Sequence, residues 1–228
     1  MTFINSLKEI DGKIILKRNE PPSAELIISN EKSILVCFLD TETTGVNKLN
    51  DQIIELAFKV VEFEESSGKI ISIKCEYESF NQPSKSIDNK ITTLTGINNE
   101  MVKNKEIDWS KVDSLLKDVD FIVAHNARFD RAFVDRHSSI SPKKIWACSI
   151  KDIDWFSKGF SNQKQELLCY WHGFYCDAHR AMNDVDALIQ LMIHSHYDKN
   201  RPILELIKNA KKIICKILVT NFPYDEQK

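Results

Sequence analysis

Two carboxylates one residue apart, Asp40 and Glu42, directly follow an apolar run at residues 34–39. The run is short, rich in β-branched residues and apolar on both faces, which is typical of a central strand buried on both sides. Residues i and i+2 of a strand point to the same face, so the two acids would stand side by side. Two such anions repel each other unless a cation bridges them, and oxygen ligands suit Mg²⁺ or Mn²⁺. The pair alone is equally compatible with two solvated loop acids.

Two further acids lie on the apolar faces of expected helices, where an acid is unfavourable. Asp130 shares its face with two phenylalanines, and Asp184 lies between Ala181 and Leu188 in an apolar stripe. An ionised acid on a buried face is costly unless it is paired or binds a metal. Asp186 falls on the outward side of the same helix, so we expect it to be solvated.

The four acids Asp40, Glu42, Asp130 and Asp184 could surround two divalent cations. The helix that carries Asp130 starts directly after a strand, at the carboxyl edge of the sheet where sites of α/β proteins gather. Paired divalent ions are the recurrent device for in-line displacement at phosphorus. Histidine is the side chain best suited to proton transfer near neutral pH, so His179, five residues before Asp184, could take the proton of an attacking water.

Three segments of the chain, in order, resemble the motifs of the DEDDh class of 3′-5′ exonucleases. They are Asp40-Thr41-Glu42-Thr43-Thr44-Gly45, His125-Asn126-Ala127-Arg128-Phe129-Asp130 and His179-Arg180-Ala181-Met182-Asn183-Asp184. This class includes the proofreading epsilon subunit of the bacterial replicative polymerase and ribonuclease T. Residues 51–57 and 91–97 are similar to the same group, and residues 146–160 resemble a bacterial epsilon-like subgroup. The resemblance covers about residues 34–195.

The resemblance implies an α/β fold of the ribonuclease H-like type, with three layers and a mixed central sheet flanked by helices. It implies two Mg²⁺ or Mn²⁺ ions and release of nucleoside 5′-monophosphates from a 3′ end. By the family pattern, Asp40, Glu42 and Asp184 hold the metals directly, with Asp40 bridging them. The same pattern gives Asp130 a role at the second metal through water and makes His179 the general base.

The resemblance also implies a groove for the terminal nucleotide. The residues that it places there are Thr41, Thr43, Gly45, Val46, Ile54, Glu55, His125, Asn126 and Phe129. Val46 occupies a position where the family usually has a larger aliphatic residue that wedges against the terminal base. The expected partner is nucleic acid with a 3′ end, with single-stranded DNA favoured; the alternative is a 3′-5′ exoribonuclease of ribonuclease T type. A DNA polymerase subunit is a candidate partner, and a homodimer is a candidate by analogy with ribonuclease T.

Three alternatives compete with this interpretation. A phosphatase of haloacid-dehalogenase type also has an aspartate at a strand end, but it needs a second aspartate where this chain has Glu42. Zinc could bind at residues whose spacing of 3, 4 and 3 places them on one helix face, namely Cys169, His172, Cys176 and His179. The third alternative is a non-catalytic nucleic-acid or polymerase-binding module on the same fold.

The elements expected around these motifs alternate between strands and helices. We predict a three-stranded antiparallel meander over residues 34–39, 53–63 and 69–80, and further strands over 121–124 and 144–148. Helices are predicted over 83–95, 108–119, 126–138, 181–195 and 203–207, and short strands over 13–17, 26–29 and 213–219. The expected organisation is an N-terminal extension (1–33), an exonuclease domain (34–198) and a C-terminal helix and strand (199–228).

Composition narrows the class of protein. The chain has 228 residues, of which 43% are hydrophobic, and a net charge of -2, so total charge supplies no argument for nucleic-acid binding. The start does not resemble a signal peptide, and no apolar stretch approaches the length of a membrane span. Six cysteines without a Cys-x-x-Cys pair indicate a reduced, cytoplasmic setting.

Two groups of residues have no assigned chemistry. The basic residues, expected to form a solvated helix face rather than a backbone-tracking patch, are Arg128, Arg131, Arg136, Lys143, Lys144 and Lys151. The aromatic residues Trp155, Phe156 and Phe160 are expected in a core or lid rather than stacked on bases.

Overall fold

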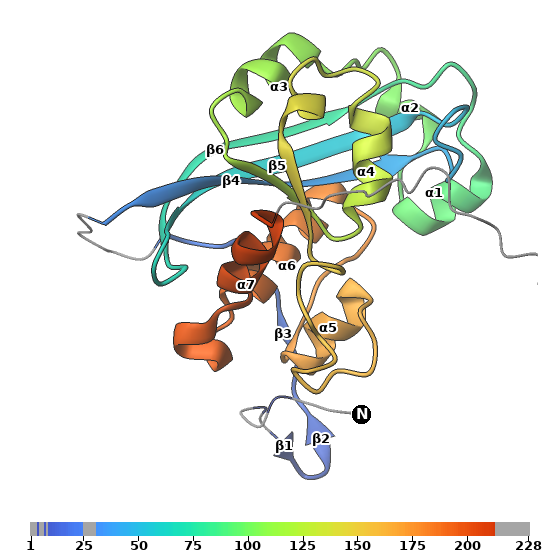
Figure 1. Ribbon diagram of the computed structural model, residues 1–228. Helices are drawn as coiled ribbons and strands as arrows, with labels where there is room; N and C mark the ends of the chain where they lie inside the picture. Colours follow the sequence, from blue (N-terminus) through green and yellow to red (C-terminus); the bar gives the residue numbers. More distant parts are fainter. Residues whose placement is uncertain (1–3, 5–6, 8, 25–30, 213–228) are drawn as a thin grey trace, which may run out of the picture.

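The computed structural model describes residues 4, 7, 9–24 and 31–212 (Figure 1). The strands predicted over 26–29 and 213–219 lie outside these residues. No helix among the described residues is long and apolar enough to cross a membrane.

A five-stranded mixed sheet forms the centre of the fold. Its strands, in spatial order, are β6 (Ile70–Phe80), β5 (Ile53–Glu64), β4 (Ser33–Thr43), β7 (Phe121–Ala124) and β8 (Ile145–Cys148). The β4–β5 and β5–β6 pairs are antiparallel, whereas β7 pairs parallel with both β4 and β8. The predicted meander and the predicted mixed α/β sheet are therefore confirmed.

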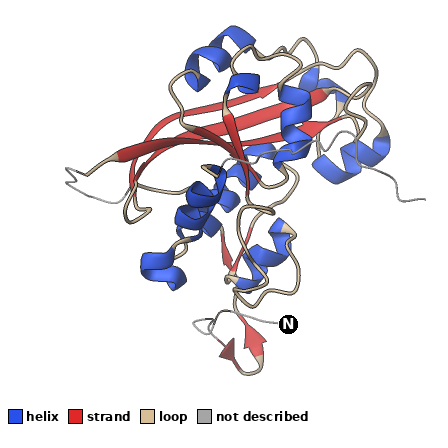
Figure 2. Ribbon diagram, in the orientation of Figure 1, coloured by secondary structure: helices blue, strands red, loops and turns tan. Residues whose placement is uncertain are grey.

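Helices cover both faces of this sheet, as Figure 2 shows. On one side lie α3 (Trp109–Leu116) and α4 (Ala127–Val134), and on the other α6 (Ala181–Ile193) and α7 (Pro202–Ala210). Each face of the sheet has its own hydrophobic core, and successive residues of β4 point into opposite cores. Leu39 packs on the side of α3 and α4, and Phe38 packs on the side of α6 and α7. Both side chains are fully buried, as expected for a central strand between two helical layers.

The remaining helices are short. They are α1 (Asn89–Thr95), α2 (Asn99–Val102), α5 (Gln165–Trp171) and the 3₁₀ turns η1 (Ser141–Lys143) and η2 (Ser195–Asn200). The helix predicted over 83–95 begins only at Asn89, because the Asp88 side chain accepts a hydrogen bond from the Lys90 N–H and caps it there. Gly96, with a φ of 72°, ends it in the left-handed conformation.

The segment before the sheet folds back onto the chain that precedes α6. Strands β1 (Glu9–Ile10) and β2 (Lys13–Ile14) form a small antiparallel hairpin. Strand β3 (Lys17–Arg18) then pairs parallel with β9 (Phe174–Tyr175). The strand predicted over 13–17 is thus divided between two sheets.

The prediction that Asp186 is solvated is wrong. Its side chain lies 2.7 Å from the Lys59 ammonium, and the residue is only 7% exposed. Lys59 comes from the middle of β5 and is itself 2% exposed, so a buried cation from the sheet turns this side of α6 into an interior face. Burial raises the pKa of the Asp186 carboxyl, and the Lys59 charge opposes that rise.

Candidate active site

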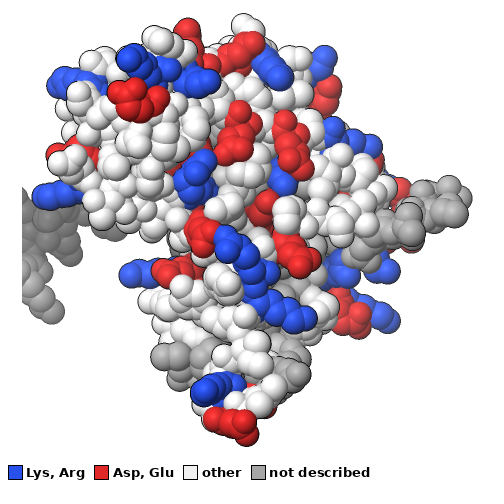
Figure 3. Space-filling model, turned by 180° about the vertical axis from the view of Figure 1, so that it is seen from behind, with Lys and Arg blue, Asp and Glu red and all other residues white. Residues whose placement is uncertain are grey.

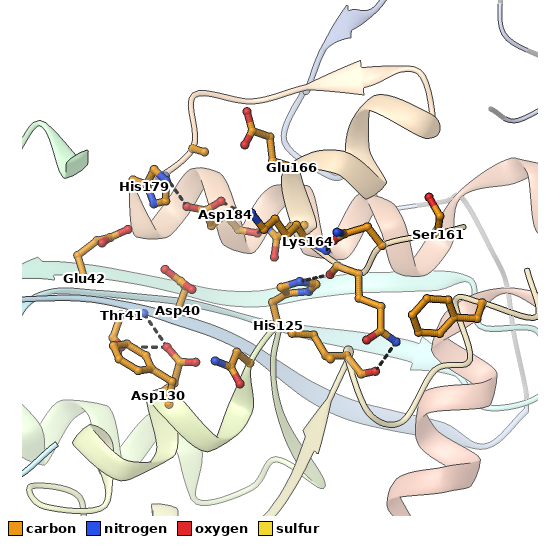
Figure 4. Close-up of a pocket in the computed structure, with 18 residues that line it drawn as sticks. Asp40, Thr41, Glu42, His125, Asp130, Ser161, Lys164, Glu166, His179 and Asp184 are labelled. Atoms are coloured by element: carbon orange, nitrogen blue, oxygen red, sulfur yellow. Dashed lines mark hydrogen bonds between the residues drawn. The ribbon is translucent and has the colours of Figure 1, made fainter. Parts of the chain in front are cut away.

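Three carboxylates converge at the end of β4 (Figure 4). Asp40 and Glu42 come from the last residues of this strand, and Asp184 comes from the first turn of α6. One oxygen of each lies within 4.8 Å of the others, and all three residues are half-buried. Within the described part of the chain, no other group of three or more metal-ligating side chains meets that distance.

The strand geometry explains why the first two acids face the same way. Residues 40 and 42 are separated by Thr41, whose side chain points to the opposite face and is buried. The ladder with β5 shifts register after Glu42, and the Thr43 hydroxyl donates a hydrogen bond to the Gly45 carbonyl, 2.6 Å away. The strand therefore ends just beyond the pair of acids.

Hydrogen bonds hold Asp184 in place from two directions. Its Oδ2 accepts from the backbone N–H of His179 at 2.8 Å. The side-chain amide of Gln165, at the start of α5, donates to the Asp184 backbone carbonyl at 2.8 Å and lies 3.4 Å from Oδ1. The rotamer of this carboxylate is fixed by its neighbours before any ligand binds.

Asp130 is oriented differently from the other acids. It is 3% exposed, and its Oδ1 accepts hydrogen bonds from the Thr41 backbone N–H (3.1 Å) and hydroxyl (2.9 Å). Burial raises the pKa of Asp130 to about 7, although the hydrogen bonds from Thr41 oppose that rise. This acid lines the same cavity but stands outside the cluster of three.

The cluster carries more negative charge than its surroundings balance. The pKa of Asp40 is raised well above its ordinary value, first by burial and then by the charge of Asp130. Burial and the charge of Asp184 raise the pKa of Glu42 to about 8, and burial raises that of Asp184 to about 6. Half-buried, mutually repelling carboxylate oxygens at this spacing fit hard divalent cations such as Mg²⁺ or Mn²⁺.

Without divalent cations, the protein is expected to become less stable as the pH rises from about 4 to about 8. The unfolded carboxyls release their protons near 3.8 and 4.5, whereas the folded Asp184 and Glu42 hold theirs to about 6 and about 8. The folded state thus binds more protons in this window, and raising the pH penalises it. Thermal unfolding in EDTA across this range, for the wild type and Glu42→Gln, measures the effect. A midpoint difference that does not change with pH would contradict it.

His179 stands at the mouth of the cluster (Figure 4). The residue is exposed, and it lies in the loop between β9 and α6. Its backbone has a φ of 64°, the left-handed region that costs a non-glycine residue about 1–2 kcal/mol. The conformation places its side chain beside the acids, where the prediction of a general base requires it.

A cavity of about 780 Å³ opens over these acids. Other residues that line it are Thr41, His125, Asn126, Phe129, Ile150, Phe156, Ser161, Asn162, Gln163, Lys164, Gln165, Glu166 and Ala178. The side on which the loop from 149 to 164 lies carries polar side chains together with Ile150 and Phe156, and the side formed by β4 and α6 carries the carboxylates. The cavity is therefore acidic on one side and mixed on the other.

His125 connects the loop from 149 to 164 to the site through two hydrogen bonds. Its Nδ1 lies 2.8 Å from the Ser149 hydroxyl, and its Nε2 lies 2.8 Å from the Gln163 carbonyl oxygen. Because a carbonyl can only accept, Nε2 carries the proton. Burial lowers the pKa of His125 to about 4, so the ring is neutral near pH 7. It lines the cavity, as predicted, with both nitrogens already bonded to protein.

The structure brings some of the predicted groove residues to the cavity and not others. Thr41, His125, Asn126 and Phe129 line it, and Val46, 86% exposed, lines a smaller cavity of about 210 Å³ that shares Asn126 and Phe129. Thr43, the last residue of β4, and Gly45, just beyond it, line neither cavity.

Ile54 and Glu55 are not at the cavity, which corrects the expectation that they approach bases. Ile54 is fully buried in a small core with Ile87 and Ile97. Glu55 is also fully buried, and its carboxylate accepts hydrogen bonds from the Arg180 guanidinium (2.9 Å) and the Ala181 backbone N–H (2.9 Å). Its neighbour in space is the start of α6.

The zinc alternative does not fit the packing of His172. Nδ1 of this buried ring lies 2.6 Å from the Leu168 carbonyl oxygen, and Nε2 lies 2.7 Å from the Tyr197 hydroxyl. Burial lowers the pKa of His172 to about 3. With both nitrogens engaged, the ring offers no lone pair toward Cys169 or Cys176.

The aromatic residues after β8 divide into two roles. Trp155 and Phe160 are buried in the core on the α6 side, which confirms the core role predicted for them. Phe156 is 59% exposed and lines the cavity. It was not predicted as a site residue, because an irregular loop shows no periodicity that would direct its side chains, and Gln165, at the start of α5, was missed as well.

Several of the predicted basic residues make bonds within the protein. Arg136 donates to the carbonyl oxygens of Lys48 and Asp51, and Lys144 donates to that of Val119. The face shown in Figure 3 has basic and acidic side chains intermingled. Of the six predicted basic residues, Arg128 lines the smaller cavity, and none lines the larger one.

Comparisons with known proteins agree with this geometry. A family model described as "Exonuclease", of the RNase T type, matches residues 37–192. The chain is 32% identical over 119 residues to a PolC-type DNA polymerase III of Thermotoga maritima, which covers 51% of this chain and 8% of that protein. It is 36% identical over 117 residues to the 3′-5′ exonuclease DinG of Bacillus subtilis, covering 50% of this chain and 12% of that protein.

The chain thus corresponds to a small part of the length of each of these relatives. Among solved structures, Exonuclease X in complex with 5′ overhanging duplex DNA superposes with a TM-score of 0.53 at 20% identity. That alignment covers 77% of this chain and 99% of Exonuclease X. At this identity the likeness shows the fold, and it confirms the predicted ribonuclease H-like architecture. Since the family model spans most of the chain, from β4 through α6, the protein belongs to the DEDD exonuclease family.

Proposed function

We propose that the protein is a metal-dependent 3′-5′ exonuclease that removes nucleoside 5′-monophosphates from single-stranded DNA. The observation that carries this proposal is the convergence of Asp40, Glu42 and Asp184 within 4.8 Å in a cavity that His179 also lines. The cluster lies inside the region matched by the exonuclease family. It combines the charge needed to hold cations with a side chain that can accept a proton.

In this proposal, Asp40, Glu42 and Asp184 hold two divalent cations, and Asp130 assists through water. Such cations activate water and stabilise the charge that develops on the phosphoryl oxygens. His179 takes the proton of the attacking water and, because it is exposed, can pass it to solvent.

Positioning falls to other residues of the chain. Thr41 fixes Asp130 through two hydrogen bonds, and Gln165 fixes Asp184. The neutral ring of His125 holds the loop that forms the opposite side of the cavity. These contacts keep the acids and the loop in one arrangement, so little reorganisation is needed when substrate binds.

Several features support a single-stranded end as the substrate. The half-buried acids lie within a cavity of about 780 Å³, which has room for a frayed terminus rather than for a duplex. Phe156 on the loop and Phe129 on α4 both line it and can stack on bases without reading their identity. The PolC-type relative suggests a polymerase subunit as partner, and homodimerisation remains a further proposal.

The test is a time course on matched DNA and RNA, single- and double-stranded, each labelled at the 3′ end. With Mg²⁺ or Mn²⁺ the label should appear as a mononucleotide, fastest from single-stranded DNA, and EDTA should stop its release. Faster release from RNA would favour an exoribonuclease of ribonuclease T type. Equal, metal-independent release by the wild type and Asp40→Ala would reject the two-metal hypothesis, and no hydrolysis by either would favour a non-catalytic binding module.

A further inference from the structure

The segment before the sheet packs against the loop that presents His179. The Lys17 backbone N–H donates to the Gly173 carbonyl at 2.9 Å, and the Asn19 N–H donates to the Tyr175 carbonyl at 2.7 Å. These bonds make β3, which lies beside α5 in Figure 1, a parallel partner of β9. The second bond ends four residues before His179, and β3 itself lies before residue 37, where the family match begins.

Further contacts attach the same segment along its length. The Ile4 backbone N–H donates to the Trp171 carbonyl at 3.0 Å, and the Gln190 side chain donates to the Glu20 carbonyl at 3.2 Å. Ile4 is 4% exposed and belongs to the core on the α6 side. The segment is therefore anchored to the elements on both sides of the loop, α5 and α6.

The loop is fixed immediately before and after His179. Before it, Asp177 forms an ion pair with Arg18, and its carbonyl accepts from the Asn183 side chain at 2.9 Å. After it, Arg180 is bound to the buried Glu55. The left-handed backbone of His179 lies between these two anchors, and strain of this kind persists only where the surroundings hold it.

We propose that residues 17–19 are a positioning element that holds the His179 loop in its active conformation. The inference rests on the proposed function, in which His179 is the general base. If the β3 contacts are lost, the stretch before His179 keeps only the bond from Asn183 to the Asp177 carbonyl, whereas the stretch after it keeps the ion pair with Glu55. The backbone of His179 can then relax from the left-handed conformation, which moves the imidazole away from the water that it must deprotonate. Misplacement of about 1 Å is sufficient to cost up to about 10²-fold in rate.

The variant that tests this inference is Asn19→Pro in the full-length chain. Proline removes the N–H that bonds Tyr175, and the extended conformation that it imposes on Arg18 is one that a strand already has. We expect kcat on 3′-labelled single-stranded DNA to fall about tenfold with KM unchanged. Ile15→Pro, at an exposed position between β2 and β3, is the matched control and should retain wild-type kcat. Arg18→Ala should have a smaller effect, because its ion pair is exposed, and Arg18→Lys should restore it.

A double-mutant cycle separates positioning of His179 from a general structural role. In a His179→Ala background, Asn19→Pro should cause no further loss of kcat, because the group that it positions is absent. The same tenfold loss in both backgrounds would overturn the proposal, and so would a wild-type kcat for Asn19→Pro.

A second measurement does not depend on activity. Amide hydrogen exchange over residues 176–180 should be faster in Asn19→Pro than in the wild type and Ile15→Pro, because the loop opens more often. Unchanged exchange would overturn the positioning role even if the enzyme is active. Conversely, if Asn19→Pro exchanges faster but the wild type shows no metal-dependent hydrolysis, the role of β3 in holding the loop stands and the proposed function is rejected.

Discussion

Replacing Asp40 with alanine is expected to lower kcat/KM by about 10³-fold or more, which corresponds to about 4 kcal/mol of transition-state stabilisation. Asp40 is the acid at the centre of the site, since its pKa responds to the charges of Asp130, Asp184 and Glu42. In the proposed mechanism Asp40 would help to hold the cations, which would supply water activation and charge stabilisation, so its loss would weaken both.

Initial rates on 3′-labelled single-stranded DNA, measured over a range of Mg²⁺ and Mn²⁺ concentrations, provide the measurement. Asp118→Ala is the control, because that side chain is 75% exposed and lies in the turn before β7. Activity of Asp40→Ala that returns fully at high metal concentration would show that Asp40 only tightens metal binding. An undiminished rate would remove Asp40 from the mechanism.

The same substitution should have the opposite effect on the stability of the metal-free protein. Burial and the charges of four neighbouring acids (Asp130, Asp184, Glu42 and Glu55) raise the pKa of Asp40, so its removal relieves this penalty above the ordinary pKa of an aspartate. The thermal midpoint of Asp40→Ala in EDTA should therefore exceed that of the wild type, and added Mg²⁺ should stabilise the wild type more. A residue placed for catalysis at the expense of stability behaves in this way.

The acids were predictable from the sequence because short-range geometry determines where they point. Positions 40 and 42 must share one face of a strand, and an acid in the first turn of a helix that follows a strand must lie at the sheet edge. The apolar run of β4 and the amphipathic pattern of α6 placed Asp40, Glu42 and Asp184 before any distance was known. The antiparallel meander of β4, β5 and β6 also followed from local patterns, since a turn at 66–68 joins β5 to β6.

The errors arose where a distant partner determines the environment. Asp186 looked solvated because nothing near it in sequence shows that Lys59 enters from β5. Glu55 looked like a groove residue, yet its partner Arg180 lies 125 positions later and draws it to the start of α6. Gln165 holds Asp184 from the first residue of α5, and nothing near it in sequence indicates that its side chain reaches the start of α6. Pairings over such separations are set by tertiary packing, which a local pattern does not contain.

Among these long-range contacts, the Glu55–Arg180 ion pair should contribute most to stability. Replacing Arg180 with methionine would leave the Glu55 carboxylate, which is fully buried, without its charged partner. Loss of one partner of a buried ion pair costs about 3–5 kcal/mol, which for a chain of this size lowers the thermal midpoint by about 10 °C. Calorimetry or circular dichroism melts measure this shift, and kcat should fall as well, because Arg180 fixes the loop just after His179.

Two further variants decide whether the buried charge causes the loss. Glu55→Gln combined with Arg180→Met removes both charges, so it should be more stable than Arg180→Met alone. Glu78→Gln is the matched control. Glu78 lies 3.6 Å from the same guanidinium, but its side chain is 43% exposed, so the free energy of unfolding should change by less than about 1 kcal/mol. If the thermal midpoint of Arg180→Met equals that of the wild type, the Ala181 N–H and the surrounding dipoles suffice to hold Glu55. The start of α6, and with it Asp184, would then be positioned by the helix itself rather than by the ion pair.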